Sequence, residues 1–132
     1  MLIRRWHAVA DDERGYLAHF RRKVLPTLRS INGFEGAVVL RRVTGAARVE
    51  IEVITCWRSI NAIRRFAGDN TDRAVVEKEA RAFLRSFARR VQHFEVMLDA
   101  RRASRQSDHE ESTSKAQRNQ RSKPRSRADT DG

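Results

Sequence analysis

Apolar and polar positions alternate between residues 49 and 58, and this is the clearest pattern in the chain. A period of two is that of a β-strand with chemically different faces. Directly after it, Ser59 is a typical helix N-cap and Gly68 a typical C-terminal residue, with apolar residues at helical spacing between them. The pattern therefore predicts a strand that runs into a short helix. The two faces of the strand are Val49, Ile51, Val53, Thr55 and Trp57, against Glu50, Glu52, Ile54, Cys56 and Arg58.

Two further segments alternate as strands do. Residues 2–9 predict a first strand, but both of its faces are mixed, so the pattern leaves open whether Trp6 or His7 points into the body. Residues 34–43 predict a second strand. A turn at residues 44–47 then joins it to the strand with the clear alternation, which makes the two a hairpin.

Apolar residues recur at helical spacing in two places. The first stripe follows Asp11, a good helix-starting residue, and we expect a kink or a fresh helix start at Pro26. The second stripe follows Asp72 and predicts another long helix, after which residues 93–98 predict a final strand. The stripes are Tyr16, Phe20, Val24 and Leu28, then Val76, Ala80, Phe83, Phe87 and Val91.

This order of elements is strand, helix, strand, strand, helix, strand. It predicts an α+β fold of the ferredoxin-like βαββαβ type, in which helices cover one face of a four-stranded antiparallel sheet. The apolar side of the strand that carries Trp57 is expected to meet the helices. The other, mixed side suits a second copy of the sheet across a twofold axis, so we expect a homodimer whose sheets enclose a barrel-like space.

Composition divides the chain into a body and a tail. Residues 1–98 hold the predicted elements, whereas residues 99–132 contain no aromatic residue and no Val, Ile, Leu or Phe, so we expect that tail to be disordered. The net charge of +11 is carried almost entirely by arginine. It reflects either a coding bias or a surface that binds polyanions, and the arginine-rich tail is the candidate for weak, non-specific polyanion contact.

Some partners and compartments are disfavoured. Cys56 is the only cysteine, which excludes an intrachain disulfide and favours a reducing cytoplasm. No apolar run approaches the roughly 18 residues of a membrane span, and the first residues do not form a signal peptide. We therefore expect a soluble, cytoplasmic protein with no membrane partner.

The residues also carry a family likeness. Residues 55–68 (TCWRSINAIRRFAG) fit the pattern T-x-W-x-S-x-x-A-x-x-x-F-x-G, which resembles the signature of the antibiotic biosynthesis monooxygenase domain family. The resemblance spans residues 3–98. Further matches are Pro26, Leu28, Ile31, Gly33, Phe34, Gly36, Arg41, Arg42, Glu79, Ala80, Val91, His93, Phe94, Glu95 and Val96.

The resemblance implies a dimeric α+β barrel and monooxygenation without a cofactor, with neither a metal nor a flavin. The implied substrate is a small aromatic, polyketide-like or quinol compound. A haem-degrading branch of the family relies on an Asn, a Trp and a His, of which only Trp57 has a counterpart here. Haem degradation is therefore disfavoured.

Oxygenation without a cofactor needs a base that removes a phenol or enol proton, and a cation or hydrogen-bond donor that stabilises the resulting anion. His7 and His93 lie on the first and last predicted strands, which are neighbours in this fold, and are the candidate bases. Either is equally a structural histidine. Arg41 and Arg42 end the second strand and are candidates for holding an oxyanion, or else form a solvated strand end.

Three aromatic residues are candidate pocket walls, and the alternative for each is a plain core position: Trp57, Tyr16 and Phe20. His19 lies off the apolar stripe of its helix and His109 lies in the tail, so neither is taken as a site residue. Cys56 falls on the face of its strand opposite Trp57, with no sign of activation.

Two other functional classes compete with the enzyme. RNA-recognition domains share this topology, and residues 32–40 (NGFEGAVVL) faintly resemble their aromatic signature, but they offer one aromatic residue where base stacking needs two or three. A non-catalytic ligand-binding or regulatory dimer would use the same cavity with an inert lining. The direction of His7 is the observation that separates this class from an enzyme.

Overall fold

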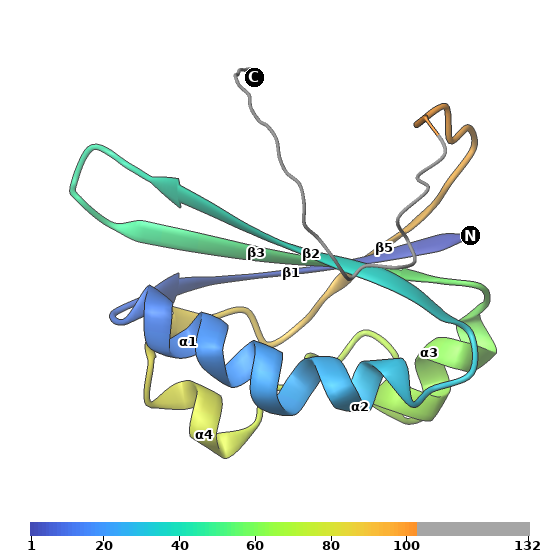
Figure 1. Cartoon of the computed structure of the whole chain (residues 1–132), viewed down its shortest axis with the longest axis horizontal. Coiled ribbons are helices and arrows are strands. Elements are labelled where there is room, and N and C mark those ends of the chain that lie inside the picture. Colours follow the sequence, from blue (N-terminus) through green and yellow to red (C-terminus); the bar gives the residue numbers. More distant parts are fainter. Residues whose placement is uncertain (103–132) are drawn as a thin grey trace, which may run out of the picture. The chain divides into compact units, whose positions relative to one another are not determined.

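The structure, a computed structural model, describes residues 1–102, and within them one antiparallel sheet has five strands (Figure 1). The long strands lie in the order β2, β3, β1, and the two short strands both pair with β1, one near each of its ends. The ferredoxin-like α+β class expected from the sequence is confirmed. The strands are β1 (Leu2–Ala10), β2 (Phe34–Val43), β3 (Val49–Trp57), β4 (Leu84–Phe87) and β5 (Gln92–Glu95).

The register between β1 and β3 decides which side chains meet the helices. Trp6 lies opposite Val53, and the two share the covered face, whereas His7 lies opposite Glu52 on the open face. Paired residues in an antiparallel ladder point to the same side of the sheet, so one pair fixes the whole strand. Arg4 therefore lies on the covered face with Trp6, and His7 lies on the other.

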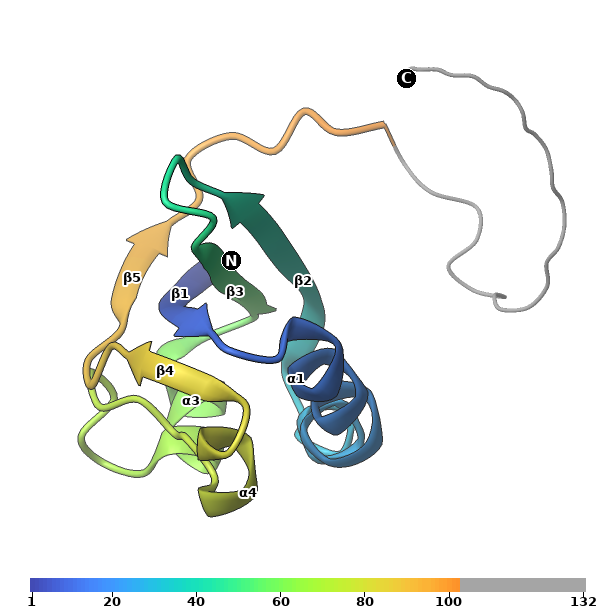
Figure 2. The ribbon, with the colours of Figure 1, turned by 90° about the vertical axis from the view of Figure 1, so that its left-hand side faces the viewer.

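The helices all cover one face of the sheet (Figures 1 and 2). Asp12 caps the first helix by accepting a hydrogen bond of 2.9 Å from the Gly15 N–H, and Ser59 caps α3 by accepting one of 3.2 Å from the Ala62 N–H. Gly68 ends α3 with a φ of 82°, as the sequence indicated. The helical segments are α1 (Glu13–His19), η1 (Phe20–Val24), α2 (Leu25–Arg29), α3 (Ile60–Ala67) and α4 (Lys78–Arg81).

A π-helical segment, η1, joins α1 to α2 without a break. The buried stripe on these helices has a spacing of four, and in a regular α-helix such positions advance by about 40° with each step. The wider π turn cancels this drift, so that Tyr16, Phe20 and Leu28 all face the sheet. Pro26 is the second residue of α2, and the helical backbone runs into it from η1, so the chain has an irregular π turn where a kink or a fresh helix start was expected.

The long helix predicted after Asp72 is wrong. Only Lys78–Arg81 is helical, and Leu84–Phe87 forms β4 on the edge of β1. The reason is the hydrogen-bonding need of that edge: the Asp11 N–H donates to the Phe83 carbonyl, and the Ala88 N–H donates to the His7 carbonyl. These hydrogen bonds to distant residues override the helical preference that the spacing of the apolar residues indicates. The last strand is also shorter than the predicted 93–98.

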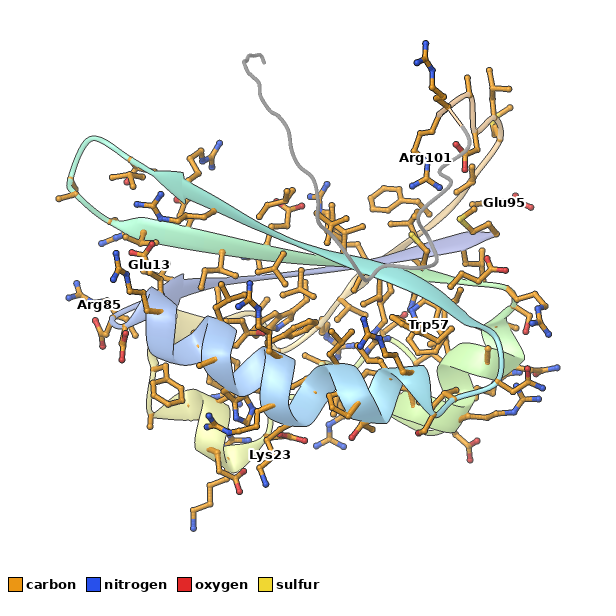
Figure 3. The ribbon with its side chains drawn as sticks, in the orientation of Figure 1. Glu13, Lys23, Trp57, Arg85, Glu95 and Arg101 are labelled. Atoms are coloured by element: carbon orange, nitrogen blue, oxygen red, sulfur yellow. The ribbon has the colours of Figure 1, made fainter. Side chains whose placement is uncertain are left out.

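Trp57 lies in the core between the sheet and the helical layer (Figure 3). Its side chain is fully buried, with the ring of Phe34 edge-on at 5.3 Å and that of Phe66 stacked at 5.8 Å. The indole N–H donates a hydrogen bond of 2.8 Å to the hydroxyl of Thr55. The tryptophan of the family-like signature thus fixes the junction of β3 with α3.

Residues Met1–Met97 form one compact unit. The predicted tail begins at residue 99, and residues 103–132 lie outside the described residues. Its disorder and its polyanion contact therefore stay predictions.

Candidate functional site

A cavity of about 60 Å³ lies between the covered face of β1 and β3 and the helices that cross it. Its apolar walls include three aromatic rings, with centroids 6.1 Å apart for Trp6 and Tyr16 and 6.4 Å apart for Tyr16 and Phe20. Its polar lining comes from β1, α1 and the segment before α4: Arg4, His19 and Glu77, beside Thr55 of β3. An aromatic pocket with a few convergent polar groups is the usual form of a small-molecule site.

Tyr16 places a phenol in this cavity from the first helix. Burial, with a smaller contribution from the charge of Glu77, raises the pKa of its hydroxyl well above the usual value near 10. The hydroxyl is therefore protonated throughout the physiological range. It can donate a hydrogen bond to a ligand but does not act as a base.

His19 is buried beside the cavity, with 2% of its surface exposed. Its Nε2 lies 3.0 Å from Oε1 of Glu77, at ion-pair distance, although the angle is not that of a directed hydrogen bond. Glu77 is partly exposed, so the pair reaches from the cavity wall toward solvent. An imidazole beside a carboxylate is a common general base.

Sequence reasoning set His19 aside, yet the signal was present. Tyr16, His19 and Phe20 fall at i, i+3 and i+4, which is one face of a helix. A histidine three residues beyond a buried aromatic residue belongs to the buried face even when the stripe is counted in fours.

Arg4 is the second polar residue that the sequence did not single out. Its side chain is buried on the covered face of β1, where Nη1 donates to the Thr71 carbonyl and Nη2 donates to the Arg73 carbonyl at 2.8 Å. The guanidinium also lies 5.8 Å from the ring centroid of Phe66. Burial lowers its pKa to about 10, although the charge of Asp72 opposes this shift.

His93 lies behind Arg4 rather than in the cavity wall. Its Nε2 is 3.2 Å from Nη1 of Arg4, and its Nδ1 is 3.5 Å from Oδ1 of Asp72. Arginine only donates hydrogen bonds, so Nε2 accepts and the proton of a neutral ring sits on Nδ1. Burial and then the charge of Arg4 lower the pKa of His93, while Asp72 opposes the shift.

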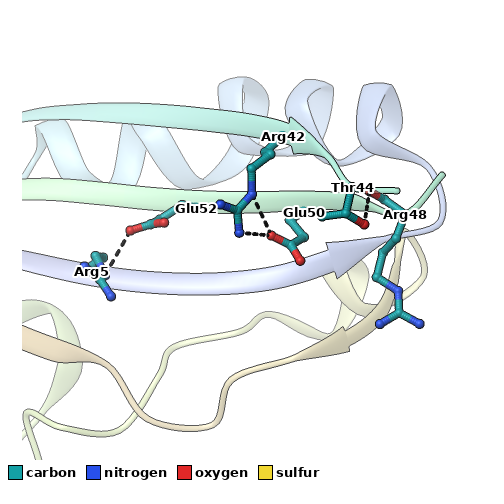
Figure 4. A network of polar contacts seen from close by, with 6 residues as sticks. All are labelled: Arg5, Arg42, Thr44, Arg48, Glu50 and Glu52. Atoms are coloured by element: carbon teal, nitrogen blue, oxygen red, sulfur yellow. Dashed lines mark hydrogen bonds and ion pairs between the residues drawn. The ribbon is translucent and has the colours of Figure 1, made fainter. Parts of the chain in front are cut away.

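The remaining predicted site residues are not gathered at this cavity. His7 is exposed on the open face of the sheet. Arg41 pairs with Glu13 at the start of α1, and Arg42 pairs with Glu50 on the open face (Figure 4). None of these three residues lines the cavity: His7 and Arg42 lie on the opposite face of the sheet, and Arg41 is on the covered face but outside the lining. Trp57 is core rather than cavity wall.

A second hollow of about 640 Å³ lies on the open face, but its chemistry is different. It is lined by charged side chains, including the ion pairs Arg5–Glu52 and Arg42–Glu50 (Figure 4). Three predicted site residues, His7, Arg41 and Arg42, meet there beside apolar side chains such as Leu40. No Phe, Trp or Tyr of the described residues lines this hollow, so it lacks the aromatic walls of the smaller cavity. The smaller cavity beside Tyr16 is therefore the better candidate site.

Within residues 1–102, no group of three or more His, Cys, Asp or Glu side chains is placed to hold a metal ion. None of the helices in the same range is long and apolar enough to cross a bilayer.

Comparison with known proteins matches the fold. No family model and no curated protein matches the sequence. Among solved structures, a cofactor-independent oxygenase from Streptomyces nogalater, SnoaB, superposes with a TM-score of 0.50 at 14% identity, over 75% of this chain and 94% of that one. A proposed antibiotic biosynthesis monooxygenase from Bacillus cereus (TM-score 0.44, 16% identity, 78% of this chain and 97% of that one) is also similar.

A third similar structure is an EthD family protein from Bacillus halodurans, with a TM-score of 0.47, 17% identity, and coverage of 74% of this chain and 100% of that one. At these identities a structural likeness shows the fold alone. The chain has the ferredoxin-like α+β fold of the Streptomyces oxygenase, which confirms that part of the expectation from the resemblance, whereas the dimeric barrel stays a prediction.

Proposed function

We propose that this chain is a cofactor-independent monooxygenase that acts on a small aromatic, polyketide-like or quinol compound. The observation that carries the proposal is the convergence of an imidazole–carboxylate pair, a buried phenol and a buried guanidinium on one aromatic-walled cavity. The fold shared with the Streptomyces oxygenase supports it.

His19 is the base in this proposal. It removes the proton of a phenol or enol, and the nearby carboxylate of Glu77 stabilises the imidazolium that forms. The Tyr16 hydroxyl and the Arg4 guanidinium then offer a hydrogen bond and a positive charge to the developing anion. His19, which borders the cavity, therefore replaces His7 and His93 as the candidate base. In this proposal His93 positions Arg4.

The overall reaction balances without a cofactor. The electron-rich carbon of the anion forms a bond to dioxygen and gives a hydroperoxide. The O–O bond then breaks as the carbon loses its remaining hydrogen as a proton, which leaves a carbonyl on the substrate and releases water. The substrate supplies the electrons, one oxygen atom enters the product, and the other leaves as water.

The size of the cavity limits the ligand. A volume of about 60 Å³ is well below the roughly 300–1,000 Å³ typical of ligand pockets. The wall formed by residues 75–77 is the part best placed to move, since Val75 lines the cavity and is 46% exposed. A substrate larger than a single ring needs that wall to open.

The test is oxygen consumption by the purified, metal-free full chain with a panel of phenols, anthrones and quinols. We expect one class to support turnover, and expect His19→Gln to lower kcat/KM about 10²-fold or more, the usual contribution of a general base. His7→Gln is the matched control, since it changes a histidine on the opposite face of the sheet. No oxygen uptake with any substrate, or equal losses in both variants, would overturn the proposal.

We also infer that the chain forms a homodimer through the open face of its sheet. This face carries exposed apolar side chains among paired charges: Val38 at 49%, Leu40 at 44% and Phe94 at 46% exposure. Arg5 bridges the two kinds of residue, because it pairs with Glu52 and lies 5.5 Å from the ring centroid of Phe94. A self-complementary face of this kind suits an isologous contact about a twofold axis.

A further inference from the structure

Arg4 has no direct ion pair in the described part of the chain; the nearby carboxylate of Asp72 contacts His93 rather than the guanidinium. Within residues 1–102 no carboxylate lies at ion-pair distance from its guanidinium, although the side chain is only 4% exposed. The next residue along the strand, Arg5, is more exposed and pairs with Glu52. A buried cation is costly unless an anion accompanies it. The molecule therefore holds a positive charge in the cavity wall that no carboxylate contacts directly, and Asp72, behind His93, offsets it only in part.

The contacts of Arg4 fix the orientation of the guanidinium but leave some of its hydrogen-bond donors unused. Its acceptors are the carbonyls of Thr71 and Arg73 and the Nε2 of His93, all of them neutral. These contacts use three of the five N–H donors that an arginine carries. The remaining donors are not used by the described residues. Because the side chain lines the cavity, they are available to a ligand inside it.

We propose that Arg4 is the anchor for an anionic oxygen, a carboxylate or an ionised phenol, on a small aromatic ligand whose ring lies against Trp6, Tyr16 and Phe20. This subsite deepens the proposed function, because it names the substrate class of the same cavity. His93, held by Asp72, acts through Arg4: a neutral ring with its proton on Nδ1 keeps an acceptor facing the guanidinium.

The competing explanation is that Arg4 only ties residues 71–73 to the sheet. A purely structural arginine gives a cavity that does not distinguish charged from neutral ligands of the same shape. Charge-assisted hydrogen bonds are about twice as strong as neutral ones, so an anchoring arginine does distinguish them.

The experiment compares isosteric probes by NMR with the ¹⁵N-labelled full chain. The probes are benzoate against benzamide, and 4-nitrophenolate against 4-nitroaniline. Trp6 lines the cavity, and its indole N–H, which donates to the Ala88 carbonyl, reports binding; that of Trp57 in the core serves as the internal reference. We expect at least one anion to bind about tenfold more tightly than its neutral partner or better, and which anion does so separates a carboxylate from a phenolate ligand.

Substitutions test whether Arg4 is the residue that causes the preference for the anionic probe. Arg4→Gln is expected to abolish it and Arg4→Lys to keep part of it, whereas Arg5→Gln, which removes one positive charge from the opposite face of the same strand, leaves it intact. If Arg4→Gln does not fold, the wild-type and Arg4→Lys comparisons still decide. Equal affinities within both probe pairs, no binding of any probe, or a preference that persists in Arg4→Gln would overturn the proposal. None of these readouts involves oxygen, so a chain that binds benzoate but consumes no oxygen refutes the oxygenase alone.

Discussion

Arg4 and His93 lie opposite each other on neighbouring strands, with Nη1 of the arginine 3.2 Å from Nε2 of the histidine. The contact joins the cavity wall to the last strand of the sheet. It also makes the protonation state of His93 matter to the fold, because a protonated ring loses its acceptor and places a second positive charge beside Arg4.

This contact predicts a pH dependence of stability. The pKa of His93 is lowered in the folded chain, by burial first and by Arg4 second, so near its pKa the unfolded chain binds more protons than the folded one. The contribution is then fully present above the unfolded value of about 6.5 and is lost as the pH falls through the lower folded value. We expect the free energy of unfolding to drop between about pH 7 and pH 5.

The measurement is urea unfolding across that range for the wild type and for His93→Gln. Glutamine keeps a neutral acceptor for Arg4 but does not titrate, so its stability should depend less steeply on pH. The other histidines are common to both chains and cancel in the comparison. Identical pH slopes would show that the Arg4–His93 contact does not govern the titration.

Gly33 predicts a second, steric effect. Its φ is 102°, and a Cβ at this position would lie 2.5 Å from the Cβ of Ala62 on α3. Gly33→Ala should therefore destabilise the chain by more than about 1 kcal/mol, since both the backbone and the packing oppose it. Gly45→Ala is the matched control, because it has a negative or extended φ and open space around it. Chemical unfolding that gives equal stabilities for the two variants would contradict the packing at Gly33.

The alternation of residues 49–57 was enough to predict β3 and the junction with α3, because both depend on local patterns. The register of β1 was not predictable in the same way. Its two faces are equally mixed, and only the pairing of Arg4 with Thr55, 51 residues away in sequence, decides that Arg4 and Trp6 face the helices. The site residue Arg4 was missed for that reason.

The segment around Leu84 shows the opposite failure, a local pattern that tertiary structure overrides. Its apolar residues have helical spacing, but the free edge of β1 offers hydrogen bonds that a helix there would leave unmade. A bulge between Val9 and Ala10 shifts the register, so that Leu84 and Phe87 both face the core. Neither the edge nor the bulge leaves a mark on the sequence of this segment.

Trp57→Phe is predicted to be destabilising even though it keeps an aromatic ring. The change removes the hydrogen bond to Thr55, a buried group, and leaves a gap where the larger indole was. The combined loss should be about 1–3 kcal/mol. Chemical unfolding measures it, and Trp6→Phe, at a half-buried position, is the comparison. A Trp57→Phe chain as stable as the wild type would mean that neither the bond nor the fit of the indole contributes.

The proposed dimer gives the last prediction. Leu40 lies on the open face in register with Glu52, and its side chain is 44% exposed in a single chain. Two such faces brought together across a twofold axis would bury Leu40 in an apolar contact, so Leu40→Glu would place an unpaired charge there. We expect sedimentation equilibrium to show a dimer for the wild type and a monomer, or at least a tenfold weaker dimer, for this variant, because a buried unpaired charge costs more than about 1.4 kcal/mol.

Leu17→Glu is the matched control for Leu40→Glu, since it puts the same charge at an exposed leucine on α1, on the helical side of the sheet. It should leave the dimer unchanged. If Leu17→Glu dissociates the dimer and Leu40→Glu does not, the helical layer forms the contact and the open face is free. If the wild type sediments as a monomer, the exposed apolar residues of the open face are not an interface between two copies of this chain.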